Sequence, residues 1–106
     1  MSVVWTQGAF TDLNSIYDAI AADRPGVAAR VIRTLMAHGE RLSNYPHRGR
    51  PGRLPETREL VIPKLPYIIV HALNPSLVST KPDVTILRVI HGAMQWPPER
   101  RPSLGF

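Results

Sequence analysis

The chain has 106 residues, no cysteine and a formal net charge of +5. This length fits a single domain over residues 1–106, and the lack of cysteine excludes disulfides, thiolate nucleophiles and cysteine-ligated zinc sites. The N-terminus has no signal-peptide pattern and no apolar run is long enough to cross a bilayer, so we expect a cytoplasmic protein with no membrane partner. The excess of Lys and Arg favours an anionic partner, either nucleic acid or an acidic protein segment.

A short strand and an amphipathic helix are predicted at the start of the chain. Val3 and Trp5 alternate with their neighbours, as in a strand. The period then changes to three and four, which indicates a helix that begins near Gly8 or Thr11. Its apolar stripe consists of Ala9, Leu13, Ile16, Tyr17 and Ile20.

A second helix is predicted after Asp23, which is a good N-cap, with Pro25 in the first turn. Its apolar stripe consists of Ala28, Val31, Leu35, His38 and Leu42. Because each helix has one apolar face, the two can pack as an antiparallel hairpin.

The second half of the chain predicts a loop and three strands. Residues 46–55 are rich in Gly, Pro and Arg and have no apolar period, so they indicate a loop. The strands are expected at 59–62, 67–73 and 84–90, with a long turn over 74–83 and a flexible tail over 97–106. The order β-α-α-β-β-β predicts an α+β fold in which the helix hairpin covers one face of a small, mainly antiparallel four-stranded sheet.

The chain resembles the RelE/ParE superfamily of bacterial toxins in segments that follow one another along almost its whole length. The matching segments are Trp5 to Tyr17, Gly49-Arg50-Pro51-Gly52-Arg53 with Thr57-Arg58-Glu59-Leu60-Val61, Tyr67-Ile68-Ile69-Val70, and Leu87-Arg88-Val89-Ile90-His91-Gly92 with Gln95-Trp96-Pro97. Each segment is weak evidence alone, but together they are specific for the superfamily.

The resemblance implies the toxin of a type II toxin–antitoxin system, silenced by a cognate antitoxin from the adjacent gene. RelE-type members cleave mRNA on the ribosome, whereas ParE-type members inhibit DNA gyrase without chemistry of their own. The expected partners are therefore the antitoxin and either ribosome and mRNA or gyrase, with operator DNA contacted only through the antitoxin. The residue types slightly favour mRNA cleavage; gyrase inhibition is the first alternative, and a non-toxic basic binding module is the second.

Metal-free RNA cleavage needs a general base, a general acid and cations near the phosphate. The catalytic residues expected here are Arg58, Arg88 and His91. The two arginines would supply the cations, and histidine is the residue type among them whose side chain is suited to carry a proton in catalysis. The set departs from the RelE pattern: the lysine pair and the C-terminal tyrosine are absent. Arg88 and His91 are also an odd number of residues apart, so a straight strand points them to opposite faces.

Each of these residues also has a structural interpretation. Arg88 could pair with Glu59, His91 could end its strand with a local hydrogen bond, and Arg58 could be an ordinary surface charge. We expect His38 on the packed face of its helix. We predict no metal site and no cofactor, because the histidines lack partners at ligand spacing.

The nucleic-acid or antitoxin contacts are expected at Arg48, Arg50, Arg53 and Trp96. Our hypothesis is that Arg50, Arg53 and Arg58 form a cationic rim that an acidic antitoxin segment covers. Trp96 could stack on a base, although packing against the sheet is the more common role for such a residue.

Overall fold

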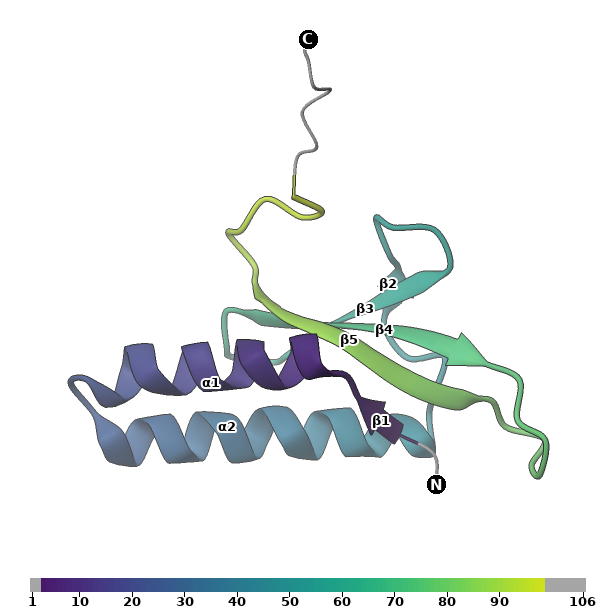
Figure 1. Ribbon diagram of the computed structural model, residues 1–106, viewed down its shortest axis with the longest axis horizontal. Coiled ribbons are helices and arrows are strands. Elements are labelled where there is room, and N and C mark those ends of the chain that lie inside the picture. The colour runs from purple at the N-terminus through teal and green to yellow at the C-terminus, as the bar shows by residue number, and fades with distance from the viewer. Residues whose placement is uncertain (1–2, 99–106) are drawn as a thin grey trace, which may run out of the picture.

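The computed structural model describes residues 3–98, with helices below a twisted sheet (Figure 1). In chain order the elements are β1 (Val3–Trp5), α1 (Gln7–Ala21), α2 (Pro25–Glu40), the short 3-10 helix η1 (Arg41–Ser43), β2 (Arg50–Pro51), β3 (Thr57–Val61), β4 (Tyr67–Asn74) and β5 (Asp83–His91). The predicted α+β order is confirmed. The exception is β2, a two-residue strand inside the segment 46–55 that was expected to be a loop throughout.

Helix α1 begins where Thr6 joins it to the sheet. The Thr6 hydroxyl accepts a hydrogen bond from the backbone N of Ala9 at 3.1 Å, which makes Thr6 the N-cap. The same hydroxyl lies 3.0 Å from the carbonyl oxygen of Ile86 on β5. The predicted start near Gly8 or Thr11 is therefore too late in the chain. The helix begins after Thr6, which is held in place by its contact with Ile86 on the distant strand β5.

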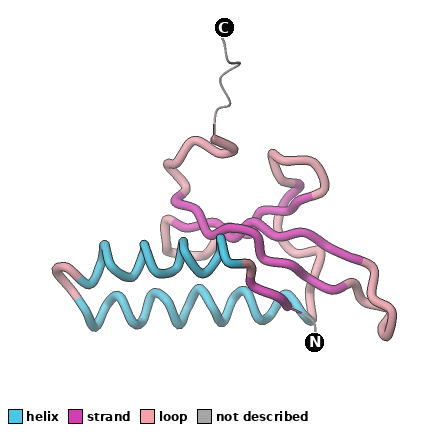
Figure 2. The backbone as a smooth tube through the Cα atoms, viewed as in Figure 1, coloured by secondary structure: helices cyan, strands magenta, loops and turns pink. Residues whose placement is uncertain are grey.

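Helix α2 begins with Pro25, as predicted, since the first turn has no use for the missing N–H. Its N-cap is Arg24, whose side chain makes no capping bond, so the prediction of Asp23 as N-cap was wrong. The two helices run antiparallel beneath the sheet (Figure 2). Within residues 3–98, neither helix has the length and apolar character needed to cross a bilayer.

The sheet has five strands in the order β1-β5-β4-β3-β2, one more than predicted. Strand β1 pairs with β5 in parallel, and all other neighbours are antiparallel. The parallel pair follows from topology, because the chain returns to the sheet through two helices and two hairpins before it reaches β5. The sheet is therefore mixed and mainly antiparallel.

Residues paired directly across strands point to the same face, so the register divides the side chains between two faces. The helix face carries the main core, in which Leu13 and Leu35 from the helices meet Ile69, Ile86 and other buried residues of the sheet. Gly39 of α2 lies so close to this layer that a Cβ would be 2.5 Å from the Trp5 ring. The helices can approach β1 only because this position has no side chain.

The opposite face, which we call the open face, carries a smaller apolar cluster of Ile68, Val70, Ile90 and Trp96. Trp96 follows β5 and is only 7% exposed, so the segment after the last strand folds back over this face. This explains why the strands are apolar on both sides. Of the predicted tail 97–106, only Pro97 and Pro98 lie within the described residues.

Candidate functional site

A row of four paired residues crosses the open face from edge to centre. Arg50 on β2 pairs with Glu59 on β3, Glu59 with Val70 on β4, and Val70 with Arg88 on β5. Val70 belongs to the open-face cluster, so all four side chains point away from the helices. Two arginines and a carboxylate thus share a face whose floor is apolar.

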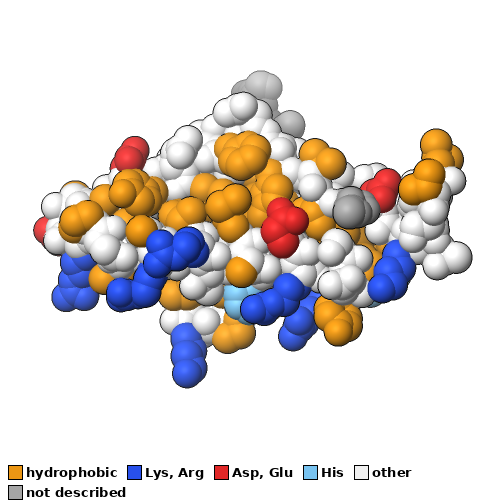
Figure 3. Space-filling view, turned by 90° about the horizontal axis from the view of Figure 1, so that it is seen from below, with side chains coloured by type: hydrophobic (Ala, Val, Ile, Leu, Met, Phe, Trp, Pro, Cys, Tyr) orange, Lys and Arg blue, Asp and Glu red, His pale blue; other side chains and the backbone are white. Residues whose placement is uncertain are grey.

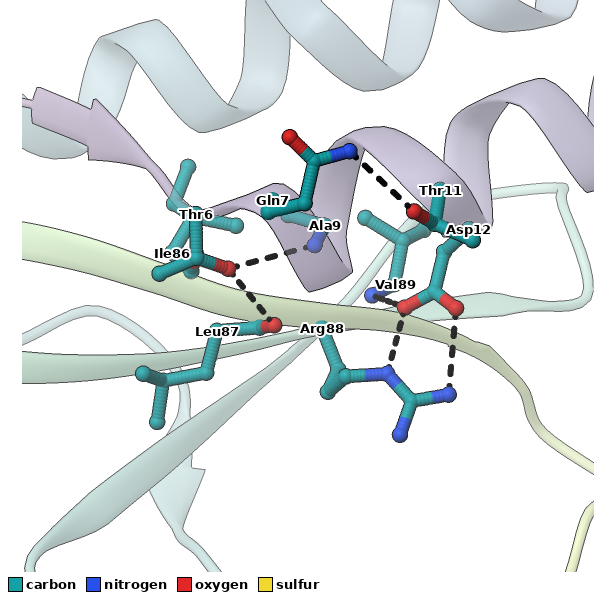
Figure 4. Close-up of polar contacts among 9 residues, drawn as sticks. All are labelled: Thr6, Gln7, Ala9, Thr11, Asp12, Ile86, Leu87, Arg88 and Val89. Carbon is teal, nitrogen blue, oxygen red and sulfur yellow. Dashed lines mark hydrogen bonds and ion pairs between the residues drawn. The ribbon is translucent and has the colours of Figure 1, made fainter.

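Arg88 is held by Asp12 of α1 (Figure 4). Its Nε donates to Asp12 Oδ2 at 2.7 Å and its Nη2 to Oδ1 at 3.0 Å, a bidentate pair. Asp12 Oδ2 also accepts from the backbone N of Val89 at 2.8 Å. One carboxylate therefore joins the first helix to both the side chain and the backbone of the last strand.

The same Arg88 guanidinium lies 5.3 Å above the centre of the Trp96 ring. The hydrogen bonds that Arg88 donates to Asp12 raise the pKa of Arg88 above its ordinary value, so the residue stays charged at any physiological pH. Arg88 is thus held between an anion and an aromatic face. The predicted pairing of Arg88 with Glu59 is wrong; its partner is Asp12.

Glu59 is instead bound by the two loop arginines. Arg53 donates from Nη2 to Oε1 at 3.0 Å and from its backbone N to Oε2 at 2.9 Å, and Arg50 Nη2 donates to Oε1 at 3.1 Å. These hydrogen bonds, those from Arg53 first, lower the pKa of the Glu59 carboxyl to about 2. The loop can turn this closely over β3 because Gly49 has φ of +96°, where a Cβ would lie 2.6 Å from the Glu59 carbonyl oxygen.

Arg58 points to the other face of the sheet. It pairs with His71, which pairs with the core residue Ile86 on the helix face. Its Nη2 donates to the Gly49 carbonyl at 2.8 Å, toward the outer edge of the sheet. The predicted rim of Arg50, Arg53 and Arg58 is therefore divided between two faces, and two of its three members are bound to Glu59.

His71 itself is fully buried, with its Nε2 3.2 Å from the Pro46 carbonyl oxygen. Burial, with a smaller contribution from nearby Arg58, lowers the pKa of His71 below its ordinary value, so the ring is neutral near pH 7.

His91 ends β5 on the helix side of the sheet. It pairs with Tyr67, whose ring meets the His91 ring edge to face at 5.6 Å between centres. His91 Nδ1 accepts a hydrogen bond from the backbone N of Ala93 at 3.0 Å. The local bond expected at a strand end is present, and the imidazole is exposed.

The residues expected to cleave RNA are not brought together. Pairing is continuous from Arg88 to His91, and the irregularity of β5 lies before Arg88, so these side chains point to opposite faces. Arg58 is two strand spacings from β5, about 10 Å, and a further distance of about 13 Å along the strands separates its level from that of His91.

Two of the expected binding residues also have clear positions. Arg48 is exposed, with its guanidinium carbon 5.9 Å from the centre of the Tyr45 ring. Trp96 is buried against the sheet and has no open face for a base. No group of three potential metal-ligating side chains gathers anywhere in residues 3–98.

The family model described as "ParE toxin of type II toxin-antitoxin system, parDE" matches residues 3–96. The chain belongs to this family. It is accordingly the toxin of a type II toxin–antitoxin system, and membership implies a cognate antitoxin as partner.

Individual relatives of this ParE-family chain agree with the assignment. It is 41% identical over 93 residues to "Putative toxin Y4kP" of Sinorhizobium fredii, covering 88% of this chain and 90% of the relative. It is 34% identical over 91 residues to "Toxin RelE2" of Caulobacter vibrioides, covering 86% and 94%. A solved structure, "Chromosomal ParDE TA system from P. aeruginosa", superposes with a TM-score of 0.71 at 26% identity, covering 86% and 95%.

The site of this ParE-family toxin depends on carboxylates that the sequence analysis did not assign correctly. Asp12 was overlooked, although it adjoins the apolar stripe through Ala9 and Leu13, where a carboxylate needs a partner. Glu59 was considered as the partner of Arg88, although it follows the arginine-rich loop directly and is the one acid in its strand, which makes the loop arginines its natural partners. Both acids stand beside apolar residues in the sequence, Asp12 next to Leu13 and Glu59 next to Leu60.

Proposed function

We propose that this ParE-family toxin inhibits DNA gyrase by binding, without catalytic chemistry of its own, and that it acts in the cytoplasm where gyrase works. The observation that carries the proposal is the bidentate pair between Arg88 and Asp12. An arginine that must offset charge on a reacting phosphate has to offer its N–H groups to that phosphate. Here the Nε and Nη2 donors are already bound to a carboxylate of the same chain.

The positions of the other expected catalytic residues support the same reading. Arg58 donates to the Gly49 carbonyl at the far edge of the sheet, and His91 lies on the face opposite Arg88. RNA cleavage on this chain would require the Asp12 pair to break and the side chains to gather from two faces. A binding mechanism requires neither change.

The test compares two reactions with the same purified chain. We expect it to block supercoiling of relaxed plasmid by gyrase and to leave mRNA intact in a reconstituted translation reaction, as read by primer extension. His91→Ala should inhibit gyrase as the unchanged chain does. Ribosome-dependent cuts in mRNA, with gyrase unaffected, would reverse the assignment.

Ribosome-dependent mRNA cleavage remains the second candidate, because one exposed imidazole is available beside a phenol. The His91 ring is accessible and contacts Tyr67 at 5.6 Å, and the relative "Toxin RelE2" is 34% identical. If this function holds, His91→Ala and Arg88→Ala each abolish mRNA cleavage while circular dichroism shows an intact fold. Normal cutting by either variant removes that residue from the site.

A further inference from the structure

A pocket lies at the end of the molecule where the turn between β4 and β5 meets the segment after η1. It has a volume of about 530 Å³ and is formed by residues 44–48 and 80–82, which we call the cationic pocket. The Lys81 ammonium joins its two sides by donating to the Asn44 carbonyl at 3.4 Å. The volume is within the range of small-ligand sites.

The charges around this pocket are not neutralised by the chain. Arg48 and Lys81 line it, and Arg41 lies close by at the end of α2. No salt bridge joins any of the three to a carboxylate within residues 3–98, whereas Arg50, Arg53 and Arg88 are all paired. Figure 3 shows Lys and Arg side chains gathered along one long edge of the helix side, with acidic side chains mostly elsewhere.

The pKa of His38 is affected by the positive charges at this end of the molecule. Burial lowers the pKa of its imidazole first, and the charges of Arg41 and Arg48 lower it further. Its Nδ1 lies 3.5 Å from Arg41 Nη1. Arg41 and Arg48 thus both lie near enough to His38 to disfavour its protonation, so positive charge gathers at this end of the molecule, where it would attract an anionic ligand.

Tyr45 distinguishes among anionic ligands. Its side chain is 61% exposed at the pocket, and the Arg48 guanidinium lies over the ring at 5.9 Å. An accessible aromatic ring beside unpaired cations is the pairing that binds single-stranded nucleic acid, because the ring stacks on a base while the cations meet phosphates. An acidic peptide would use the cations but would have no need of the ring.

We propose that the cationic pocket binds a single-stranded nucleic acid, with phosphates at Arg48 and Lys81 and a base on Tyr45. The site is separate from the open face and does not depend on gyrase being the target. Of the residues expected from the sequence to contact nucleic acid or the antitoxin, Arg48 alone lines this pocket. The pocket would give the toxin a nucleic-acid contact of its own, in addition to the operator DNA expected to be contacted through the antitoxin.

The test measures fluorescence anisotropy of a labelled single-stranded DNA of about 12 nucleotides with the full chain freed of antitoxin. Arg48→Gln with Lys81→Gln should weaken binding about 10-fold at low salt and reduce the slope of log affinity against log salt by about 1.4, for two phosphate contacts. The control, Arg33→Gln with Lys64→Gln, removes the same charge from exposed positions outside the pocket and should leave both unchanged. Equal losses in the two variants would mean non-specific attraction and overturn the proposal.

A second pair of variants tests the stacking. Tyr45→Phe keeps the ring and should bind as the unchanged chain does, whereas Tyr45→Ala should bind about 10-fold more weakly. If Tyr45→Ala binds DNA normally, no base stacks on Tyr45 and the proposal is wrong. If the pocket variants lose affinity for poly-glutamate but not for DNA, the ligand is an acidic protein segment and the proposal is also wrong.

Discussion

The open face and the cationic pocket both contain arginines, but only the open face supplies carboxylates for them. Arg50 and Arg53 surround Glu59, and Arg88 is held by Asp12. In the pocket, Arg48 lies over the Tyr45 ring and forms no salt bridge within residues 3–98. Two arginines of the segment 46–55, Arg50 and Arg53, thus help to hold the fold, whereas Arg48 of the same segment forms no salt bridge in the part of the chain that the structure describes.

This difference shows that an arginine is free to bind a ligand only when the fold does not pair it with a carboxylate of the same chain. An arginine bound to an acid of its own chain presents little net charge to a ligand, since a ligand must displace the acid first. An exposed and unpaired arginine needs no such exchange. Substitutions at the acids and at the unpaired cations therefore test the comparison from its two sides.

Removal of the Asp12 carboxylate should have the largest effect on stability. In Asp12→Ala, Arg88 remains over Trp96 without its anion and the Val89 backbone N loses its acceptor, so we expect the free energy of unfolding to fall by about 3 kcal/mol. Urea unfolding followed by circular dichroism measures this. Asp18→Ala removes the same charge from an exposed position of α1 and should cost less than about 0.5 kcal/mol. Equal losses of stability in Asp12→Ala and Asp18→Ala would show that the Asp12–Arg88 pair does not stabilise the fold.

Neutralisation of Glu59 should have a somewhat smaller effect. Its carboxylate is only 1% exposed, but the side chains of Arg50 and Arg53 are 55% and 42% exposed and can turn to water when it is lost. We expect Glu59→Gln to lower the free energy of unfolding by about 2 kcal/mol. Glu56→Gln, at an exposed turn position, is the matched control; a larger loss there would contradict the assignment.

The same carboxylate predicts an acid limb in the stability profile. Its pKa is lowered from 4.5 to about 2 on folding, so its contribution is complete above about pH 4.5 and is lost as the pH falls toward 2. Unfolding free energies measured between pH 6 and pH 2 should fall by about 2 kcal/mol more in the unchanged chain than in Glu59→Gln. Parallel profiles for the two chains would rule out this origin.

The smallest effect is expected in the cationic pocket. Arg48→Gln with Lys81→Gln removes no salt bridge within residues 3–98 and removes the Arg48 charge that lowers the pKa of the nearby His38. We expect a change within about 0.5 kcal/mol, in the stabilising direction at low salt and vanishing at high salt. A loss of more than about 1 kcal/mol would show that these cations do have partners in the fold.

Periodicity and turn chemistry in the sequence were enough to predict most of the architecture. The apolar stripes reveal α1 and α2, because burial of one helix face requires an apolar residue at every third or fourth position. The short apolar runs reveal β4 and β5 in the same way. Strand β2 was missed because two residues carry no period and are assigned by pairing with Glu59 and Arg58. The Thr6 cap was missed because its second contact is on β5.

The site was less predictable than the fold. Residue type identified Arg48, Arg88 and His91 as exceptional, but the face of each depends on pairing register, which a sequence does not show. The choice of Asp12 or Glu59 as partner of Arg88 depends on where α1 crosses β5. Lys81 was not singled out because it is far from Arg48 in the sequence, and the two come to one pocket only where the β4–β5 turn meets the segment after η1.

The place of β1 at the edge of the sheet, beside β5, has a consequence for synthesis. The first strand to leave the ribosome has the last strand as its only neighbour, and the Thr6 and Asp12 contacts also wait for residues 86–89. Such long-range pairings make folding slow and concerted. The sheet therefore cannot be completed until β5 has been translated, and chains terminated before β5 should be neither folded nor toxic.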